Sequence, residues 1–503
     1  MRHADAAEDG HDLTRGEVQT WCWSDVEEAT GTQIAAGTGA VRVRGGEQGA
    51  DISVEEAEHG QQREDHGRER DGSGDYLHDG EPLGAAEHAA GDHQASDEHG
   101  AHLLHPDAGK PEEYRGDVSV VVPTGPVVCS LRHPKQKSCI SAVWEVGFRM
   151  PYRWKVAPED LFVERYWQMV NNGLPIADVD TVRSAVTDMW LDEPGGWVYE
   201  WSRLAAGYAE LGQHHLAALA YGWAKFPTLA DDAKRTALER QLEQYLLAAP
   251  GFEVGFERRA VQVPCGEGVT AVPVHFLTPP GWSGDTPVLL ASGGVDTWKM
   301  DLHGLFEAVA LRTRMGVLAF DIPGTGECAG PMDSEDGADL VRALAIEARA
   351  LGNGRVLHLG ISMGGHFSAC SGLAGDVDAA IVIGGPIEAA FAQDRTFAYG
   401  MEGSVGNALG FDHEPNDAQL ARIWPPFDLR PLLNLDANVP MLVINGAGDV
   451  HVPQQDTLVF DGRRDTEVHL LPDTGHCAAS KMPQVLELMF EWIDRHQFSS
   501  VRR

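Results

Sequence analysis

The chain has 503 residues, more than the roughly 100 to 200 of a typical domain, so we expect one large domain with additional segments. Its formal net charge of -37 argues against nucleic acid as a partner, because phosphate backbones are bound by clustered Lys and Arg. An acidic protein also gains nothing from an anionic membrane surface.

Features of exported or membrane-spanning proteins are missing from the sequence. The first thirty residues carry Asp and Glu without an apolar run, unlike a signal peptide. No stretch approaches the roughly 20 apolar residues of a membrane span. The 7 cysteines are scattered, without the spacing of a zinc site or a redox pair. We therefore expect a cytoplasmic protein with reduced thiols.

The N-terminal segment, residues 1–145, is dense in His, Glu, Asp, Gly and Gln. Such a composition buries too little apolar surface to offset the entropy of ordering, so we expect disorder. Five of its histidines lie close together and suggest metal binding, but no repeated ligand spacing supports a site: His88, His93, His99, His102 and His105. An alternative is that translation starts at Met150 and that this segment is absent from the native protein.

A helical period follows, and residues 150–252 are predicted to form an all-helical domain. Apolar residues recur at spacings of three and four in five segments separated by Gly, Pro or Asp. The predicted helices span 159–174, 178–190, 195–212, 214–227 and 231–250. Their many aromatic side chains are expected to form the core of this domain.

Residues 253–500 alternate predicted strands and helices, which indicates an α/β class. Segments 258–265 and 270–279 flank a turn-like GEGV and predict an antiparallel hairpin. Apolar runs typical of a buried, mostly parallel sheet follow at 287–294, 316–324, 355–362, 379–386, 440–449 and 466–473. The closing helix is predicted over 481–497.

The motif Gly360-Ile361-Ser362-Met363-Gly364 ends one of these strands and opens a predicted helix. This is G-x-S-x-G in the strand, turn, helix context of the α/β-hydrolase nucleophile elbow. The glycines allow the sharp turn that projects the Ser362 hydroxyl above the sheet. The sequence therefore predicts Ser362 as a nucleophile, with the Met363 amide as an oxyanion donor.

A nucleophilic serine needs a base and an orienting acid, which in this fold follow in the order Ser, Asp or Glu, His. Asp449 follows one strand in GAGDVHVP, and His476 follows the next in LLPDTGHC. Both are favoured over the other candidates in the same stretch. These rivals are His451, His469, Asp456 and Asp473.

The loop SGGVDTWK is expected to supply the second oxyanion donor, from the amide of Gly294 or Val295. Asp296 and Trp298 in the same loop are candidate substrate contacts. The stretch DIPGTGE at 321–327 is interpreted as a structural turn that shapes the pocket. No dinucleotide fingerprint or metal motif is present, so no cofactor and no metal are expected.

From about 158 to 497 the chain resembles α/β-hydrolases with an N-terminal helical domain, grouped with the fermentation-respiration switch proteins and 2,6-dihydroxypseudooxynicotine hydrolase. The resemblance rests on RYWQMVNNGLPIADVDTV, WVYEWSRLAAGYAELG, SGGVDTWK, DIPGTGE and GISMGG. It implies a helical cap over a Ser362, Asp449, His476 triad. Some relatives cleave carbon-carbon bonds and use a second acidic residue, for which Glu388 is the nearest candidate, against an ordinary glutamate at a helix start.

The sequence thus predicts a serine hydrolase acting by acyl transfer on an ester or an activated carbon-carbon bond. The expected substrate is a mid-sized small molecule, and the resemblance implies that a cleaved carbon-carbon bond would belong to an acyl aromatic or β-diketone compound. The alternative is a non-catalytic binding or regulatory protein on the same fold. The sequence does not fix the oligomeric state, and a homodimer is one expected assembly.

Overall fold

The computed structural model describes residues 152–265, 268–392 and 397–498. The predicted disorder of residues 1–145 and the candidate start at Met150 fall outside this part of the chain. The five clustered histidines of this segment also lie outside it. The described residues cover the stretches in which the helices and the strands are predicted.

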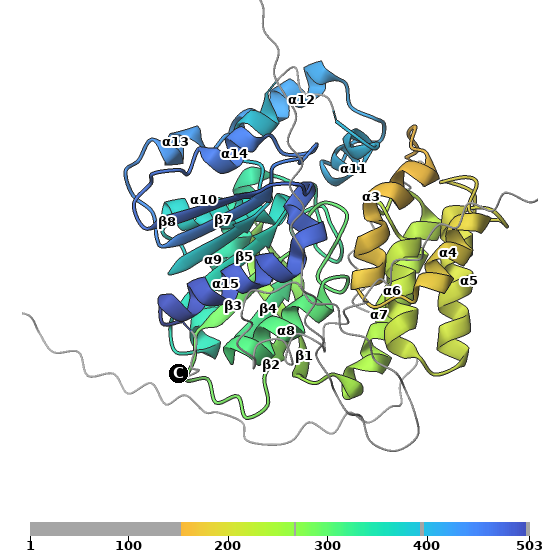
Figure 1. Ribbon diagram of the computed structural model, residues 1–503, viewed down its shortest axis with the longest axis horizontal. Helices are drawn as coiled ribbons and strands as arrows, with labels where there is room; N and C mark the ends of the chain where they lie inside the picture. The colour runs from red at the N-terminus through yellow and green to blue at the C-terminus, as the bar shows by residue number, and fades with distance from the viewer. Residues whose placement is uncertain (1–151, 266–267, 393–396, 499–503) are drawn as a thin grey trace, which may run out of the picture. The chain divides into compact units, whose positions relative to one another are not determined.

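The centre of the fold is an eight-stranded sheet in the order β1-β2-β4-β3-β5-β6-β7-β8 (Figure 1). Strands β1 and β2 form the predicted antiparallel hairpin, and β2 is also antiparallel to β4. All pairs from β4 through β3 to β8 are parallel. The strands are β1 Gly255–Cys265, β2 Gly268–Thr278, β3 Val288–Ser292, β4 Gly316–Phe320, β5 Val356–Ile361, β6 Ala379–Ile383, β7 Met441–Gly446 and β8 Thr466–Leu471. The predicted α/β class with a mostly parallel sheet is confirmed.

Helices cover both faces of the sheet, which is why the central strands are apolar on both sides. On β3, Leu290 packs in one core cluster with residues of α9, whereas Leu289 packs in another with residues of α8 and α15. The helices after β3 are α8 His303–Thr313, α9 Ser334–Leu351, α10 Met363–Ala374, α11 Met401–Ala408, α12 Asp417–Ile423, α13 Arg430–Leu433, α14 Gln454–Leu458 and α15 Met482–Arg495. The alternation of side chains along each strand thus builds a core on either side of one sheet.

Five helices precede the sheet, as the sequence predicts: α3 Pro158–Asn171, α4 Ile176–Ala185, α5 Trp197–Glu210, α6 His214–Ala224 and α7 Asp232–Ala248. We call residues 158–248 the helical segment. It has its own core, in which Trp197 and Trp201 are fully buried. Figure 1 shows the helical segment beside the sheet, with α3 on the side that faces it.

Helix α4 ends five residues before the predicted limit of residue 190. The Asp188 side chain accepts hydrogen bonds from the backbone amides of Trp190 and Leu191, at 2.7 and 2.8 Å. An Asp side chain that satisfies nearby amides in this way competes with helix formation. Apolar spacing alone did not reveal that competition.

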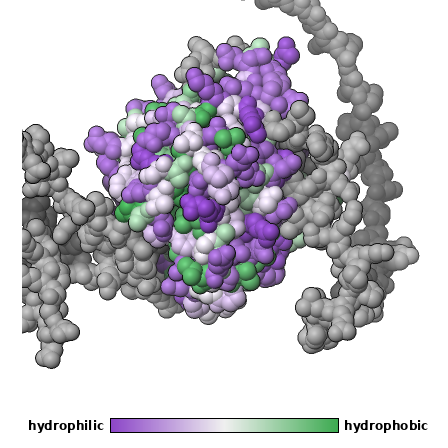
Figure 2. Space-filling view, turned by 90° about the vertical axis from the view of Figure 1, so that its right-hand side faces the viewer, coloured by the Kyte–Doolittle hydropathy of each residue, from purple (hydrophilic) through white to green (hydrophobic). Residues whose placement is uncertain are grey.

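On its outer face the helical segment is mostly hydrophilic, with hydrophobic residues in small separate patches (Figure 2). Within the described residues, no helix combines the length and the apolar character that crossing a membrane requires.

Candidate active site

Ser362 lies between β5 and α10 in a backbone conformation that side-chain-bearing residues rarely adopt, with φ 56° and ψ -125°. Sterics explain the flanking glycines. A Cβ at Gly360 would lie 2.0 Å from the Gly364 carbonyl oxygen, and one at Gly364 would lie 2.4 Å from the Gly293 carbonyl oxygen. The strained turn is the form expected of a nucleophile elbow.

His476 and Asp449 converge on this serine. His476 Nε2 lies 2.9 Å from Ser362 Oγ, and His476 Nδ1 lies 2.8 Å from Asp449 Oδ2. Asp449 Oδ2 also accepts from Asn445 at 2.8 Å, while its Oδ1 accepts from the His451 amide at 2.7 Å. The structure therefore brings together the three side chains that the sequence singled out, and the acid is fixed by donors on both oxygens.

Asp449 and His476 shift each other's pKa in the directions that favour their charged forms. Burial would raise the pKa of Asp449, but His476 and the hydrogen bonds to the carboxylate outweigh it and lower the pKa to about 2. Burial disfavours the imidazolium of His476, yet the adjacent Cys477 sulfur and the Asp449 carboxylate raise its pKa well above the ordinary value. Asp449 thus stays ionised at neutral pH, and His476 holds protons more tightly than free imidazole.

The rival acids and bases occupy other roles. Asp456 is buried and accepts hydrogen bonds from four consecutive amides, those of residues 387–390, at 2.7 to 3.2 Å. Asp473 is an exposed turn residue with φ 52°. His469 lies in β8 and bonds to Glu467 at 2.8 Å. His451 is buried beside His476, with ring centroids 5.2 Å apart.

The three expected oxyanion amides differ in their hydrogen bonds. The Gly294 amide donates to the Thr297 carbonyl at 3.0 Å and is thereby committed to its own turn. Within the described residues the amides of Val295 and Met363 donate no hydrogen bond. A Cβ at Gly294 would lie 2.8 Å from Ser362 Cβ, so the loop passes directly against the serine. The amides of Val295 and Met363 therefore remain the candidates for this role.

The two candidate substrate contacts of this loop are engaged within the protein. Asp296 is 6% exposed and forms an ion pair with Arg165 of α3 at 2.9 Å. Trp298 is buried, and the Lys225 ammonium lies 3.8 Å from its ring centroid. Trp298 packs on residues of the helical segment and anchors the loop there.

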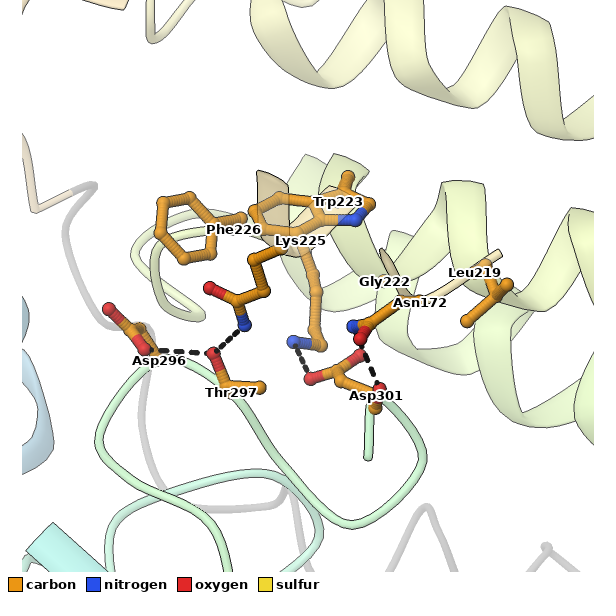
Figure 3. A pocket seen from close by; sticks show the side chains of 10 residues that line it. Asn172, Leu219, Gly222, Trp223, Lys225, Phe226, Asp296, Thr297 and Asp301 are labelled. Atoms are coloured by element: carbon orange, nitrogen blue, oxygen red, sulfur yellow. Dashed lines mark hydrogen bonds and ion pairs between the residues drawn. The ribbon is translucent and has the colours of Figure 1, made fainter. Parts of the chain in front are cut away.

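A small cavity lies between this loop and the helical segment (Figure 3). Lys225 donates to Asp301 at 2.7 Å, and Gln168 donates to Thr297 at 3.1 Å. Close approach of α6 depends on Gly222, where a Cβ would lie 2.6 Å from Asp301 Oδ1. The room inside is about 10 Å³, near the lower limit for one water molecule. The cavity therefore lies in the contact between the loop after β3 and the helical segment, and it is too small for an organic substrate.

The two motifs SGGVDTWK and DIPGTGE are joined by buried charges. Lys299 is fully buried, and its ammonium contacts Asp321 at 2.5 Å and Glu327 at 2.9 Å. Arg258 of β1 adds a second cation to Glu327. The group is an ion-pair cluster, and within the described residues no three His, Cys, Asp or Glu side chains are grouped to hold a metal ion. This fits the structural interpretation of DIPGTGE.

Glu388 lies on the loop after β6 whose amides are held by Asp456. Its carboxylate pairs with Arg430, which belongs to α13. No hydrogen bond joins Glu388 to the Ser362, His476, Asp449 group within the described residues. The structure gives its carboxylate a structural partner and shows no contact with the reacting groups.

Sequence reasoning missed two residues at the site, Glu164 and Arg165 of α3. Glu164 binds His451 Nε2, and Arg165 pairs with Asp296. The sequence did contain a pattern that could have revealed Arg165. It lies four residues from both Leu161 and Met169, on the buried face of α3. A charged residue on an apolar stripe requires a buried partner.

Known proteins resemble this chain in both sequence and fold. Residues 180–392 match the family described as Esterase FrsA-like. The chain is 30% identical to Esterase FrsA of Citrobacter koseri over 144 residues, which are 26% of this chain and 34% of the relative. It is 29% identical to Esterase FrsA of Enterobacter sp. over 164 residues, 30% of this chain and 39% of that relative. The matched segment thus spans about a third of the length of these esterases.

Solved structures extend the likeness in fold. The 2,6-dihydroxy-pseudo-oxynicotine hydrolase superposes with a TM-score of 0.54 at 21% identity, covering 65% of this chain and 94% of that chain. AbyA5 gives 0.54 at 20% identity, covering 64% and 91%. The chain has the α/β-hydrolase fold, and part of its sequence is similar to the FrsA-like esterases. In this fold, the strand order and the turn at Ser362 provide the framework that holds the candidate site.

Proposed function

We propose that this α/β-hydrolase is a serine hydrolase in which Ser362 is the nucleophile, His476 the general base and Asp449 the residue that orients His476. The observation that carries the proposal is the chain of contacts from Ser362 Oγ to His476 Nε2 at 2.9 Å and from His476 Nδ1 to Asp449 Oδ2 at 2.8 Å. The strained backbone of Ser362 supports it, since such strain is typical of functional positions.

In the proposed reaction His476 Nε2 takes the hydroxyl proton as Ser362 Oγ attacks the substrate carbonyl carbon. The amides of Met363 and Val295 stabilise the oxyanion of the tetrahedral intermediate. His476 then gives its proton to the leaving group, and an acyl-serine ester remains. A water molecule, activated by His476, attacks this ester and releases the acid and the free serine.

The proposed substrate is a mid-sized molecule with an ester or an activated carbon-carbon bond, of acyl aromatic or β-diketone type. The names of the similar proteins, esterases and 2,6-dihydroxy-pseudo-oxynicotine hydrolase, favour this class. With a carbon-carbon substrate the leaving carbanion must be delocalised as an enolate or an electron-rich ring and protonated by the His476 imidazolium. We further propose that the helical segment is a cap over Ser362.

The test is intact-mass analysis after treatment with a fluorophosphonate. We expect one adduct on the wild type, none on Ser362→Ala, and a strongly reduced amount on His476→Ala. Ser283→Ala is the matched control, because Ser283 is an exposed loop serine bonded to Asp285. It should label like the wild type.

Turnover is then measured with a series of aryl esters and β-diketones. If Ser362 is labelled but no ester or β-diketone of the series is hydrolysed, the activated serine is supported and the proposed substrate class is contradicted. No adduct on folded wild type would contradict the proposed nucleophile and favour a binding protein.

A further inference from the structure

Helix α3 presents two consecutive charged residues to the two loops that complete the candidate active site. Arg165 reaches the loop after β3, which carries the Val295 amide. Glu164 reaches the loop after β7, which carries Asp449. One turn of one helix therefore contacts both loops, although these lie about 150 residues apart in the sequence.

The contact on the β3 side is an ion pair inside the protein. Arg165 Nη2 donates to Asp296 Oδ2 at 2.9 Å, and their side chains are 11% and 8% exposed. One turn further along α3, Gln168 donates to Thr297, the residue whose carbonyl accepts from the Gly294 amide. Arg165 and Gln168 thus hold the two residues that follow Val295 in this turn.

The contact on the β7 side runs through a second histidine. The Glu164 carboxylate bonds to His451 Nε2, and the His451 backbone amide donates to Asp449 Oδ1 at 2.7 Å. The His451 ring packs edge-on to the His476 ring at 5.2 Å. With side chains 4% and 14% exposed, His451 and Glu164 form a largely buried pair.

We propose that Glu164 and Arg165 are positioning residues for the proposed hydrolysis: Glu164, through His451, fixes Asp449 and His476, and Arg165, through Asp296, fixes the oxyanion amide of Val295. The helical segment would then set the geometry of the reacting groups in addition to covering them. The inference rests on the proposed function.

Glu164 also contributes charge at the site. The groups around His476 are Asp449 and His451 from the β7 loop, Cys477 next to it in the chain, and Glu164 and Arg165 from α3. Burial raises the pKa of Glu164, but Arg165 and His451 outweigh that effect and lower it, so Glu164 is ionised near neutral pH. A carboxylate near His476 favours the imidazolium, and its removal lets His476 lose its proton at lower pH.

The experiment measures the rate of fluorophosphonate labelling of Ser362 in the full chain, from mildly acidic to mildly alkaline pH. Glu164→Gln removes the charge but keeps an oxygen that can accept from His451, whereas Glu164→Ala removes both. Glu159→Gln is the control, because Glu159 lies on the same helix in an exposed ion pair with Arg183. Circular dichroism verifies that each variant is folded.

We expect the acid limb of the pH–rate profile to move to lower pH in Glu164→Gln, with little change of the plateau. Glu164→Ala should lower the plateau by about 10- to 100-fold, the scale of a small misplacement of reacting groups. In a His451→Ala background, Glu164→Ala should cause no further loss of the plateau, because its route to Asp449 is already gone. Glu159→Gln should match the wild type.

Arg165→Met should lower the plateau to a similar degree and should move the acid limb to higher pH, opposite to Glu164→Gln, because it removes a cation near His476. Arg165→Lys should recover part of the loss. The Glu164 part would be overturned if the pH–rate profiles of the Glu164 variants superimposed on that of the wild type. It would also be overturned if Glu164→Ala lowered the plateau in the His451→Ala background as much as it does alone. A folded Arg165→Met with wild-type rates would overturn the Arg165 part. Absence of labelling in the wild type would instead overturn the proposed function itself.

Discussion

Replacing Lys299 by Met should destabilise the protein far more than replacing an exposed cation. Lys299 is fully buried, and its ammonium lies 2.5 Å from Asp321 and 2.9 Å from Glu327. Removal of one partner leaves buried carboxylates with Arg258 as their remaining cation, and breaking a buried pair costs about 3–5 kcal/mol. That is a large part of the roughly 5–15 kcal/mol that stabilises a typical domain.

The size of the effect should depend on pH. Burial would raise the pKa of Glu327, but Lys299 and Arg258 outweigh it, so the pKa is lower than in the unfolded chain. A carboxyl group with a depressed folded pKa stabilises the fold above its unfolded pKa, and this contribution is lost as the pH falls through the folded value. The Lys299→Met variant lacks much of this contribution. Its deficit should therefore be largest at neutral pH and should narrow as the pH falls toward about 4.

The assay is urea unfolding of wild type and Lys299→Met at neutral and mildly acidic pH, followed by tryptophan fluorescence. Arg240→Met is the control, because Arg240 forms an exposed pair with Glu243 on α7. It should change the free energy of unfolding by less than about 1 kcal/mol. A Lys299→Met deficit no larger than that of the control, or one that is equal at both pH values, would refute the argument.

Three further substitutions test the site. Gly294→Ala places a Cβ 2.8 Å from Ser362 Cβ, so the loop must shift and labelling by a fluorophosphonate should fall about 100-fold in a protein that circular dichroism shows to be folded. Asp449→Asn should lower kcat by about 10⁴-fold in ester hydrolysis, and the wild-type rate should itself fall as the pH drops through the raised pKa of His476. Asp456→Asn should cost about 1–3 kcal/mol in urea unfolding, because four amides share that carboxylate. Rates or stabilities equal to the wild type would count against each argument.

Much of the fold could be predicted because its signals are local. The central strands are apolar along their whole length since helices cover both faces, and a strand, Ser362 and a helix follow one another directly in the sequence. Asp449 and His476 could then be assigned because, after Ser362, each follows a strand in the regular alternation of strands and loops. The three side chains lie within hydrogen-bonding distance in the structure, although their catalytic roles stay predictions.

The long-range contacts that hold the site together could not be predicted from local sequence patterns. Arg165 pairs with Asp296, 131 residues away, and Glu164 bonds to His451, 287 residues away. Helical periodicity places Arg165 on a buried face but does not say which acid it meets. Trp298 was a candidate substrate contact because it stands near Gly294, yet its ring lies against Lys225 of the helical segment. Adjacent loop residues can point in opposite directions, and composition does not reveal which.

The loop after β3 takes its counter-charges from outside the sheet: Arg165 neutralises Asp296, and Lys225 neutralises Asp301. A shortened protein that began at residue 253 would keep all eight described strands but would leave both carboxylates without these cations. Protein engineers who want a minimal catalyst from this scaffold would therefore have to redesign that loop first. Graft experiments face the same constraint, because a helical segment taken from another enzyme would have to supply two basic residues at matching positions.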